Sequence, residues 1–168
     1  MLAKWDQHDE SLELVGISGT SGGAFNALAV WYGLVTGDAS TAIELLDGIW
    51  SDIAAKDPVD RLVNSLVMTY SWWDTKGVGM PGVSPYYSPG ASWAQQQLAT
   101  ILRQHIDFES IPALVTDDAP ELVIGAVAVE AGTFETFTNE AVTIDAVLAS
   151  AAVPRRFRAV ETDGQPQW

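Results

Sequence analysis

The sequence contains no cysteine and only two histidines, and these shortages limit the chemistry available to it. Without cysteine there is no disulfide, no thiol nucleophile and no cysteine-ligated zinc site. His8 and His105 stand far apart along the chain, and the acidic residues around them show no metal-ligand spacing. We therefore expect neither a metal site nor a cofactor.

Basic residues are also scarce, because 8 Lys and Arg stand against 22 Asp and Glu, for a formal net charge of −14. Such a surface repels phosphate backbones, so we expect no nucleic-acid partner. Polybasic docking on anionic membranes is disfavoured for the same reason. The one basic cluster, "PRRFR" at Pro154–Arg158, either contacts a phosphate head group or pairs with surface acids.

No apolar run reaches the roughly 18 residues that suggest a membrane span. The longest, "AFNALAVWYGLV", is explained by a buried helix, and the N-terminus is too polar for a secretory signal. We expect no transmembrane segment and a cytoplasmic location. With 168 residues, of which 48% are hydrophobic, the chain is long enough for one globular domain with a real core.

Hydrophobic periodicity and turn residues predict alternating strands and helices. The expected helices are Ala24–Val35 ending at Gly37, one with a Thr41/Glu44 capping box, Val59–Met68, one with a Ser92/Gln95 capping box, and Thr143–Ala152. The expected strands are Leu12–Ser18, Glu121–Glu130, "TFETFT" after an Ala131–Gly132 turn, and two arms of a C-terminal hairpin. Tyr70–Gly90 has no clear period and is expected to be a long ordered loop. This order predicts an α/β sheet with helices on its faces.

Between the first strand and the first helix, Gly19-Thr20-Ser21-Gly22-Gly23 fits the pattern G-x-S-x-G. A serine on a sharp strand-to-helix turn has strained backbone angles, and small neighbours let the chain fold back without clashes. Its oxygen stands clear of the sheet at a helix N-terminus, where free N–H groups favour developing negative charge. The alternative is an ordinary glycine-rich turn.

A nucleophilic serine needs a base, and neither histidine is well placed to be one. His8 stands in a polar N-terminal stretch typical of a solvated residue. His105 ends an amphipathic helix, where it suits the negative end of the helix dipole. A Ser-His-Asp triad therefore has little support, whereas a carboxylate acting directly on Ser21 needs no histidine.

Three stretches, "ISGTSGGAFNAL", "RQHIDFESI" and "FTNEAVTIDAVLASAAVPRRFRAVETDGQPQW", resemble the patatin-like phospholipase family over nearly the whole chain. The resemblance implies a three-layer αβα sandwich with a mostly parallel central sheet and a Ser-Asp dyad that hydrolyses lipid esters. Ser21 is then the nucleophile, within an elbow of Gly19, Thr20, Gly22 and Gly23. The Gly22 N–H then belongs to the oxyanion hole.

The chain departs from the family pattern at both ends. A Gly-rich loop that supplies oxyanion-hole N–H groups precedes the family's elbow strand, and nothing here matches it. The family's aspartate would directly follow Trp168, while Asp163 with Gly164 looks like the hairpin turn. We therefore expect residues 1–168 to be one patatin-like domain without these two segments, with an exposed sheet edge and little or no activity alone.

Other residues leave alternatives open. An aromatic cluster is either an apolar wall, lid or lipid-surface contact near Ser21, or a satellite core under the loop; it comprises Trp72, Trp73, Tyr86, Tyr87 and Trp93. No role is assigned to Asn26 or Asn139. The alternative functions are a catalytically dead patatin-like remnant that acts as a binding module, and an α/β-hydrolase esterase that uses His105.

Overall fold

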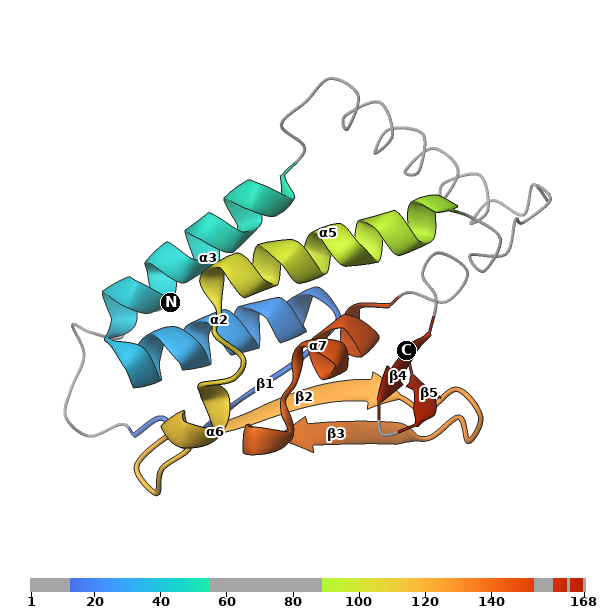
Figure 1. Ribbon diagram of the computed structural model, residues 1–168. Helices are drawn as coiled ribbons and strands as arrows, with labels where there is room; N and C mark the ends of the chain where they lie inside the picture. The colour runs from blue at the N-terminus through green and yellow to red at the C-terminus, as the bar shows by residue number, and fades with distance from the viewer. Residues whose placement is uncertain (1–12, 55–88, 153–158, 163, 168) are drawn as a thin grey trace, which may run out of the picture.

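The computed structural model in Figure 1 describes residues 13–54, 89–152, 159–162 and 164–167. It is a mixed α/β structure in which helices pack on a small sheet. Several expected features lie outside the described residues: the Val59–Met68 helix, nearly all of the Tyr70–Gly90 loop, Pro154–Arg158, and the aromatic residues Trp72, Trp73, Tyr86 and Tyr87.

Three strands form the main sheet in the order β1-β2-β3, namely β1 (Gly16–Thr20), β2 (Glu121–Val127) and β3 (Phe134–Thr138). β1 runs parallel to β2, with Thr20 opposite Gly125, and β3 runs antiparallel to β2. The strand that begins at Glu121 and the following hairpin are confirmed, although the strand ends at Val127 rather than at the predicted Glu130. The first strand was predicted over Leu12–Ser18, but it runs over Gly16–Thr20, where its backbone pairs with β2 throughout.

Five helices are described in these ranges: α2 (Gly22–Thr36), α3 (Ala39–Ile53), α5 (Pro89–His105), α6 (Ile111–Leu114) and α7 (Ile144–Ala151), with a short 3-10 turn, η2, at Asn139–Ala141. α2 and α7 agree with the expected helices to within two residues, and Gly37 ends α2 as predicted. None of these helices is long and apolar enough to cross a bilayer.

The two predicted capping boxes are wrong. α3 begins three residues before the predicted start, because the Asp38 carboxylate accepts the Thr41 backbone N–H at 3.0 Å. α5 begins at Pro89 rather than after Ser92, since proline suits the first turn, where its missing N–H costs nothing.

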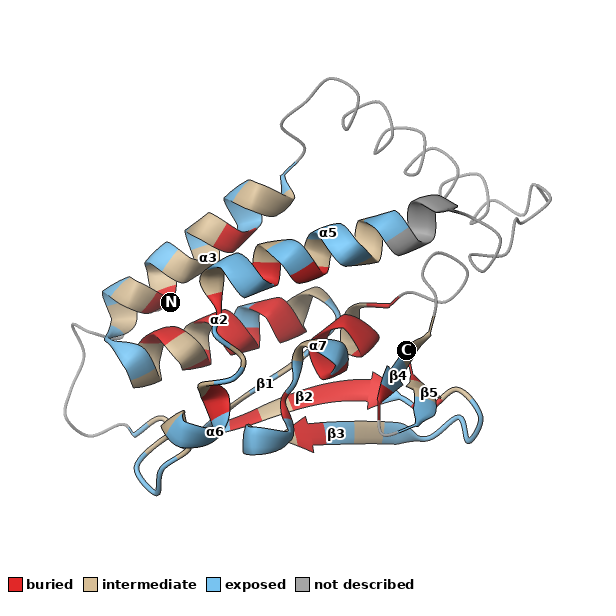
Figure 2. Ribbon diagram, viewed as in Figure 1, coloured by how far each residue is buried: buried red, intermediate tan, exposed pale blue. Residues whose placement is uncertain are grey.

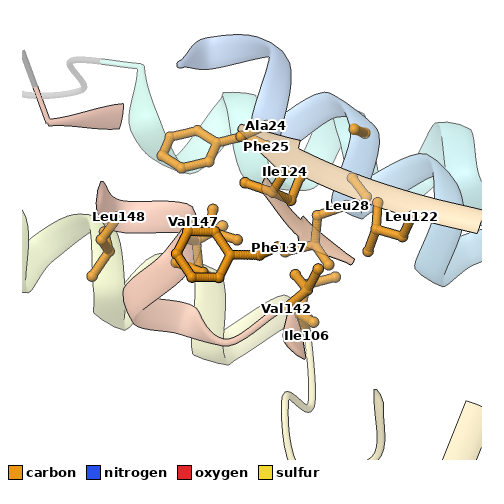
Figure 3. Close-up of a cluster of buried hydrophobic side chains, with 14 of the residues drawn as sticks. Ala24, Phe25, Leu28, Ile106, Leu122, Ile124, Phe137, Val142, Val147 and Leu148 are labelled. Atoms are coloured by element: carbon orange, nitrogen blue, oxygen red, sulfur yellow. The ribbon is translucent and has the colours of Figure 1, made fainter. Parts of the chain in front are cut away.

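The core lies between one face of the sheet and the helices. β2 alternates, with Leu122, Ile124 and Ala126 buried on this face. Figure 3 shows Phe25 and Leu28 of α2 and Val147 of α7 gathered around Leu122 and Ile124. Figure 2 shows that the buried positions of the strands and helices face one another.

The opposite face of the sheet carries Ser18 and Thr20 of β1, which are exposed, and Phe134 of β3, which is 64% exposed. Phe134 folds over Gly125 on the neighbouring strand, because its ring atom Cζ lies 2.3 Å from where a Gly125 Cβ would stand. Within the described ranges the fold therefore has two layers, one of helices and one of strands (Figure 1).

The chain ends in the predicted hairpin, β4 (Val160–Thr162) and β5 (Gln165–Gln167), with Gly164 in its turn at φ 76°. The Val129 N–H donates to the Pro166 carbonyl at 3.0 Å, and Gln167 Nε2 donates to Glu135 Oε2 at 2.6 Å. The hairpin is thereby attached beyond the end of β2.

Candidate active site

The strand-to-helix bend at Ser21 is strained. β1 ends at Thr20, α2 begins at Gly22, and Ser21 between them has φ 54° and ψ −130°. A non-glycine residue rarely adopts positive φ, and such a conformation costs on the order of 1–3 kcal/mol that surrounding packing must offset. Ser21 is also exposed, so the strain holds a hydroxyl at the surface.

Close approach of strand and helix explains why Gly19 has no side chain. A Cβ at Gly19 would stand 2.1 Å from the Gly23 carbonyl oxygen and 2.9 Å from the Ala24 nitrogen. A Cβ at Gly23, by contrast, would have no neighbour within 4 Å, and one at Gly22 would make an ordinary contact with Trp50. Sterically, therefore, the bend demands glycine only at Gly19.

The Ser21 hydroxyl does not cap the helix that follows it. Serine, threonine and aspartate at an N-cap commonly accept a backbone N–H from the first turn. Asp38 does so for α3 and Thr143 for α7, accepting from Thr41 and Ala146. Ser21 occupies the same position in α2 yet makes no such bond. Among the described residues its hydroxyl has no hydrogen-bond partner, so its lone pairs are uncommitted.

A second serine fixes the backbone of the bend. The Ser21 N–H donates to Ser150 Oγ at 2.9 Å, although the two residues are 129 positions apart. Ser150 stands in α7, which packs against β2 and α2. Ser150 was not among the site residues predicted from the sequence, and its one signal was its place in the "ASAAVP" stretch of the family resemblance.

The N-terminus of α2 can receive negative charge beside Ser21. The Ala24 N–H donates to the Ser21 carbonyl at 2.9 Å, but within the described part of the chain no protein acceptor meets the Gly22 N–H. The first turn of α2 contains no acidic residue that would compete for this end of the helix dipole. Gly22 is thus able to donate to an oxyanion on an acyl group bound to Ser21.

No base contacts Ser21 in the described ranges, since no carboxylate or imidazole described there bonds its hydroxyl. His105 Nε2 lies 2.9 Å from Asp52 Oδ2, and its ring fills the space beside Gly48. Gly48 and Asp52 share one face of α3. At about 100° of rotation per residue, Trp50 points roughly 160° away from both of them. Trp50 is the residue of α3 that contacts the Gly22 position. α3 therefore stands between His105 and the bend. His8 and Asp163 lie outside the described residues.

An aromatic side chain, Trp50, borders the bend, and it was not among the site residues predicted from the sequence. Trp50 is 41% exposed, and its indole N–H donates to Asn26 Oδ1 at 2.7 Å. Its ring packs on Phe25 with centroids 6.3 Å apart. Asn26, for which the sequence indicated no role, thus orients the indole. Trp93, the one described member of the predicted aromatic cluster, is 56% exposed on α5.

Asn139 also had no predicted role, and the structure gives it one. It has φ 49°, and its Oδ1 accepts the Leu122 N–H at 2.9 Å, so it fastens the start of β2 to the bend after β3. This position is structural, because the side chain is bonded to the backbone it supports.

A hollow of about 420 Å³ lies on the outer face of the sheet. It begins at Ser18, Gly19 and Thr20, the residues directly before Ser21, and continues to Val123, Gly125, Phe134 and Thr136. Ser21 is not among the lining residues, so the hollow adjoins the bend without enclosing its hydroxyl.

Within the described residues, no three acidic or histidine side chains gather closely enough to hold a metal ion. The chemistry that the described side chains offer at the bend is that of an uncommitted serine hydroxyl beside an open backbone N–H. Comparison with protein-family models finds no matching family, and comparison with curated proteins finds no match, so the case for a function is the local geometry of the bend and the motif that produces it.

Proposed function

We propose that this chain is the core of a serine acyl hydrolase acting on lipid or small carboxylic esters, with Ser21 as its nucleophile. The observation that carries the proposal is the bend itself. A strained, exposed serine whose hydroxyl caps nothing is unusual at a helix N-terminus, where capping by serine is the ordinary outcome. Strain of this kind clusters at functional sites.

The reaction follows from the groups at the bend. Ser21 Oγ attacks the ester carbonyl carbon while its proton passes to a base, and the carbonyl oxygen becomes an oxyanion that accepts from the Gly22 N–H. Collapse of this intermediate forms the acyl-enzyme as the alcohol leaves with the proton. Water, deprotonated by the same base, then attacks the acyl carbon, releasing the fatty acid and restoring Ser21.

We take the base to be an aspartate that follows β5, as the resemblance to patatin-like phospholipases implies, within a three-layer sandwich whose third layer is not among the described elements. The hairpin β4-β5 is attached beyond the carboxyl end of β2, which is the same end of the parallel pair from which Ser21 projects. A segment following β5 therefore starts on the side of the sheet where a base for Ser21 is needed.

A rival function is a non-catalytic binding module, and the lack of a described base contact at Ser21 is the observation that favours it. An esterase using His105 is disfavoured by the pairing of His105 with Asp52 on the far side of α3. The two rivals differ from the proposal in the reactivity of Ser21 and in the need for His105.

The test uses the chain extended through the aspartate after β5 and through the Gly-rich loop before β1. Hydrolysis of p-nitrophenyl butyrate and labelling by a fluorophosphonate probe are measured for wild type, Ser21→Ala and His105→Ala. Because a general base contributes about 10²–10⁴ in rate, the extended chain should exceed residues 1–168 by that factor. Ser21→Ala should abolish hydrolysis and labelling, and His105→Ala should retain both.

Ser21→Ala should fold as well as wild type, because the lost hydroxyl makes no described hydrogen bond. Full hydrolysis by a folded Ser21→Ala variant overturns the nucleophile assignment. An unreactive Ser21 in a folded, extended wild-type chain favours the binding module.

A further inference from the structure

We infer that Trp50 is the specificity-determining residue of this site, and that the acyl chain of the substrate lies along its indole. The inference rests on the proposed function, since it concerns the acyl group that Ser21 would carry. Three observations support it: the indole is beside the bend, it is held in one orientation, and the part that remains exposed is hydrocarbon.

The position of Trp50 is given by its contact with the first turn of α2. Its atom Cη2 lies 3.8 Å from where a Gly22 Cβ would stand, and Gly22 is both the neighbour of Ser21 and the proposed oxyanion donor. The indole therefore forms a wall directly beside the backbone that would bind the reacting carbonyl group.

The orientation of the indole is set from two sides. Asn26, one helical turn after Gly22, accepts the indole N–H at 2.7 Å, and Phe25 packs on the ring at an interplanar angle of 53°. Phe25 is itself 5% exposed and belongs to the core. A wall anchored in this way gives up little conformational entropy when a ligand lies on it.

The chemistry of the exposed part selects an apolar ligand. The only polar atom of the indole already donates to Asn26, so the rest of the ring, on a residue that is 41% exposed, is hydrocarbon. Covering the ring with methylene groups removes apolar surface from water and is therefore favourable, whereas a polar group has no free partner on the ring.

The acyl chain, rather than the alcohol, is the group that benefits. It stays covalently attached to Ser21 through both steps of the reaction, while the alcohol leaves after the first. A wall beside Gly22 therefore stays next to the acyl chain until water releases it. We expect the site to prefer medium-length acyl chains over acetate.

The experiment measures kcat/KM for p-nitrophenyl acetate, butyrate, octanoate and laurate in the extended, active chain. Trp50→Ala should lower the octanoate-to-acetate ratio of kcat/KM about tenfold, mainly through a higher KM for octanoate. Trp50→Phe should keep most of the preference. Asn26→Ala, which frees the indole without removing it, should have an intermediate effect.

The matched control is Trp93→Ala. It removes an exposed tryptophan of α5 that has no atom within 4 Å of the Gly22 Cβ position, so it should leave the ratio unchanged. An unchanged ratio in Trp50→Ala overturns the inference while leaving Ser21 catalysis intact. A series of alkyl acetates of increasing alcohol length is measured alongside. If Trp50→Ala changes the length preference only in that series, the acyl assignment is overturned. Absence of fluorophosphonate labelling in the wild-type chain would instead contradict the proposed function.

Discussion

Two residues of this protein other than glycine have positive φ, among those the structure describes, and they stand in different circumstances. Asn139, at φ 49°, follows β3 and uses its own side chain to hold the neighbouring strand, accepting from Leu122. Ser21, at φ 54°, uses its side chain for nothing in the described structure. Asparagine tolerates this region of backbone space better than serine does.

The backbone strain at Asn139 serves the structure, whereas the strain at Ser21 has no structural use for its side chain. At Asn139 the residue type and its hydrogen bond offset the conformational cost locally. At Ser21 the cost is carried by surrounding structure: the parallel pairing of β1, the buried helix α2 and the hydrogen bond to Ser150. A position whose side chain contributes nothing to its own unusual conformation is a candidate for chemistry rather than for support.

The largest effect is expected where strand and helix touch. Gly19→Ala places a Cβ against the Gly23 carbonyl, where backbone on both sides prevents relief, so we expect the free energy of unfolding to fall by about 3 kcal/mol. Gly23→Ala meets nothing within 4 Å and lies inside α2, so it should raise that free energy by up to about 1 kcal/mol. Urea unfolding of the two variants measures both. Equal destabilisation by the two alanines would contradict the described bend.

Glycine substitutions at the two strained positions should act in opposite directions. Ser21→Gly removes the conformational cost and no described hydrogen bond, so we expect the free energy of unfolding to rise by about 1 kcal/mol while hydrolysis is lost. Asn139→Gly suits the same φ but leaves the Leu122 N–H without its acceptor, so we expect a fall of about 1 kcal/mol. The same sign of change at both positions would remove the distinction between them.

Sequence reasoning found the elements that depend on local pattern. The alternation in Glu121–Val127 and the apolar run of α2 are visible in the sequence, and so are the turns at Gly132 and Gly164. The starts of α3 and α5 were missed because capping was judged from residue type alone. Thr41 is a good cap by type, but Asp38 lies earlier and accepts from both Ser40 and Thr41.

The contacts that complete the bend were beyond sequence reasoning, because they join distant segments. Ser150 meets Ser21 only once α7 packs on the sheet, and Trp50 meets Gly22 only once α3 packs on α2. A hydrophobic period predicts that Trp50 belongs to an amphipathic helix, but not that its N–H reaches Asn26. The motif therefore indicates the nucleophile, whereas the residues around it can be identified only from the three-dimensional structure.

The smallest expected effect on stability comes from comparing two helix starts. The side chain of Asp38 caps α3, whereas the side chain of Ser21 does not cap α2. The Ser40 hydroxyl, and next the Thr41 N–H, hold the pKa of Asp38 below its ordinary value of 3.8. A carboxyl group whose pKa is lower in the folded state stabilises the fold at pH values above its ordinary pKa. That contribution is lost as the pH falls through the folded-state pKa. Asp38 is fully exposed, so solvent and salt keep the effect small.

We therefore expect Asp38→Asn to lower the melting temperature slightly at pH 7, and the difference from wild type to shrink as the pH falls below 3.8. Thermal unfolding followed by circular dichroism at pH 7, 5 and 3 measures this. Ser21→Ala is the matched control, because its hydroxyl neither caps nor titrates in this range, so its difference from wild type should stay near zero at each pH. A drop in stability for Ser21→Ala comparable to that of Asp38→Asn would show that the hydroxyl supports α2, and it would move Ser21 to the structural side of the comparison.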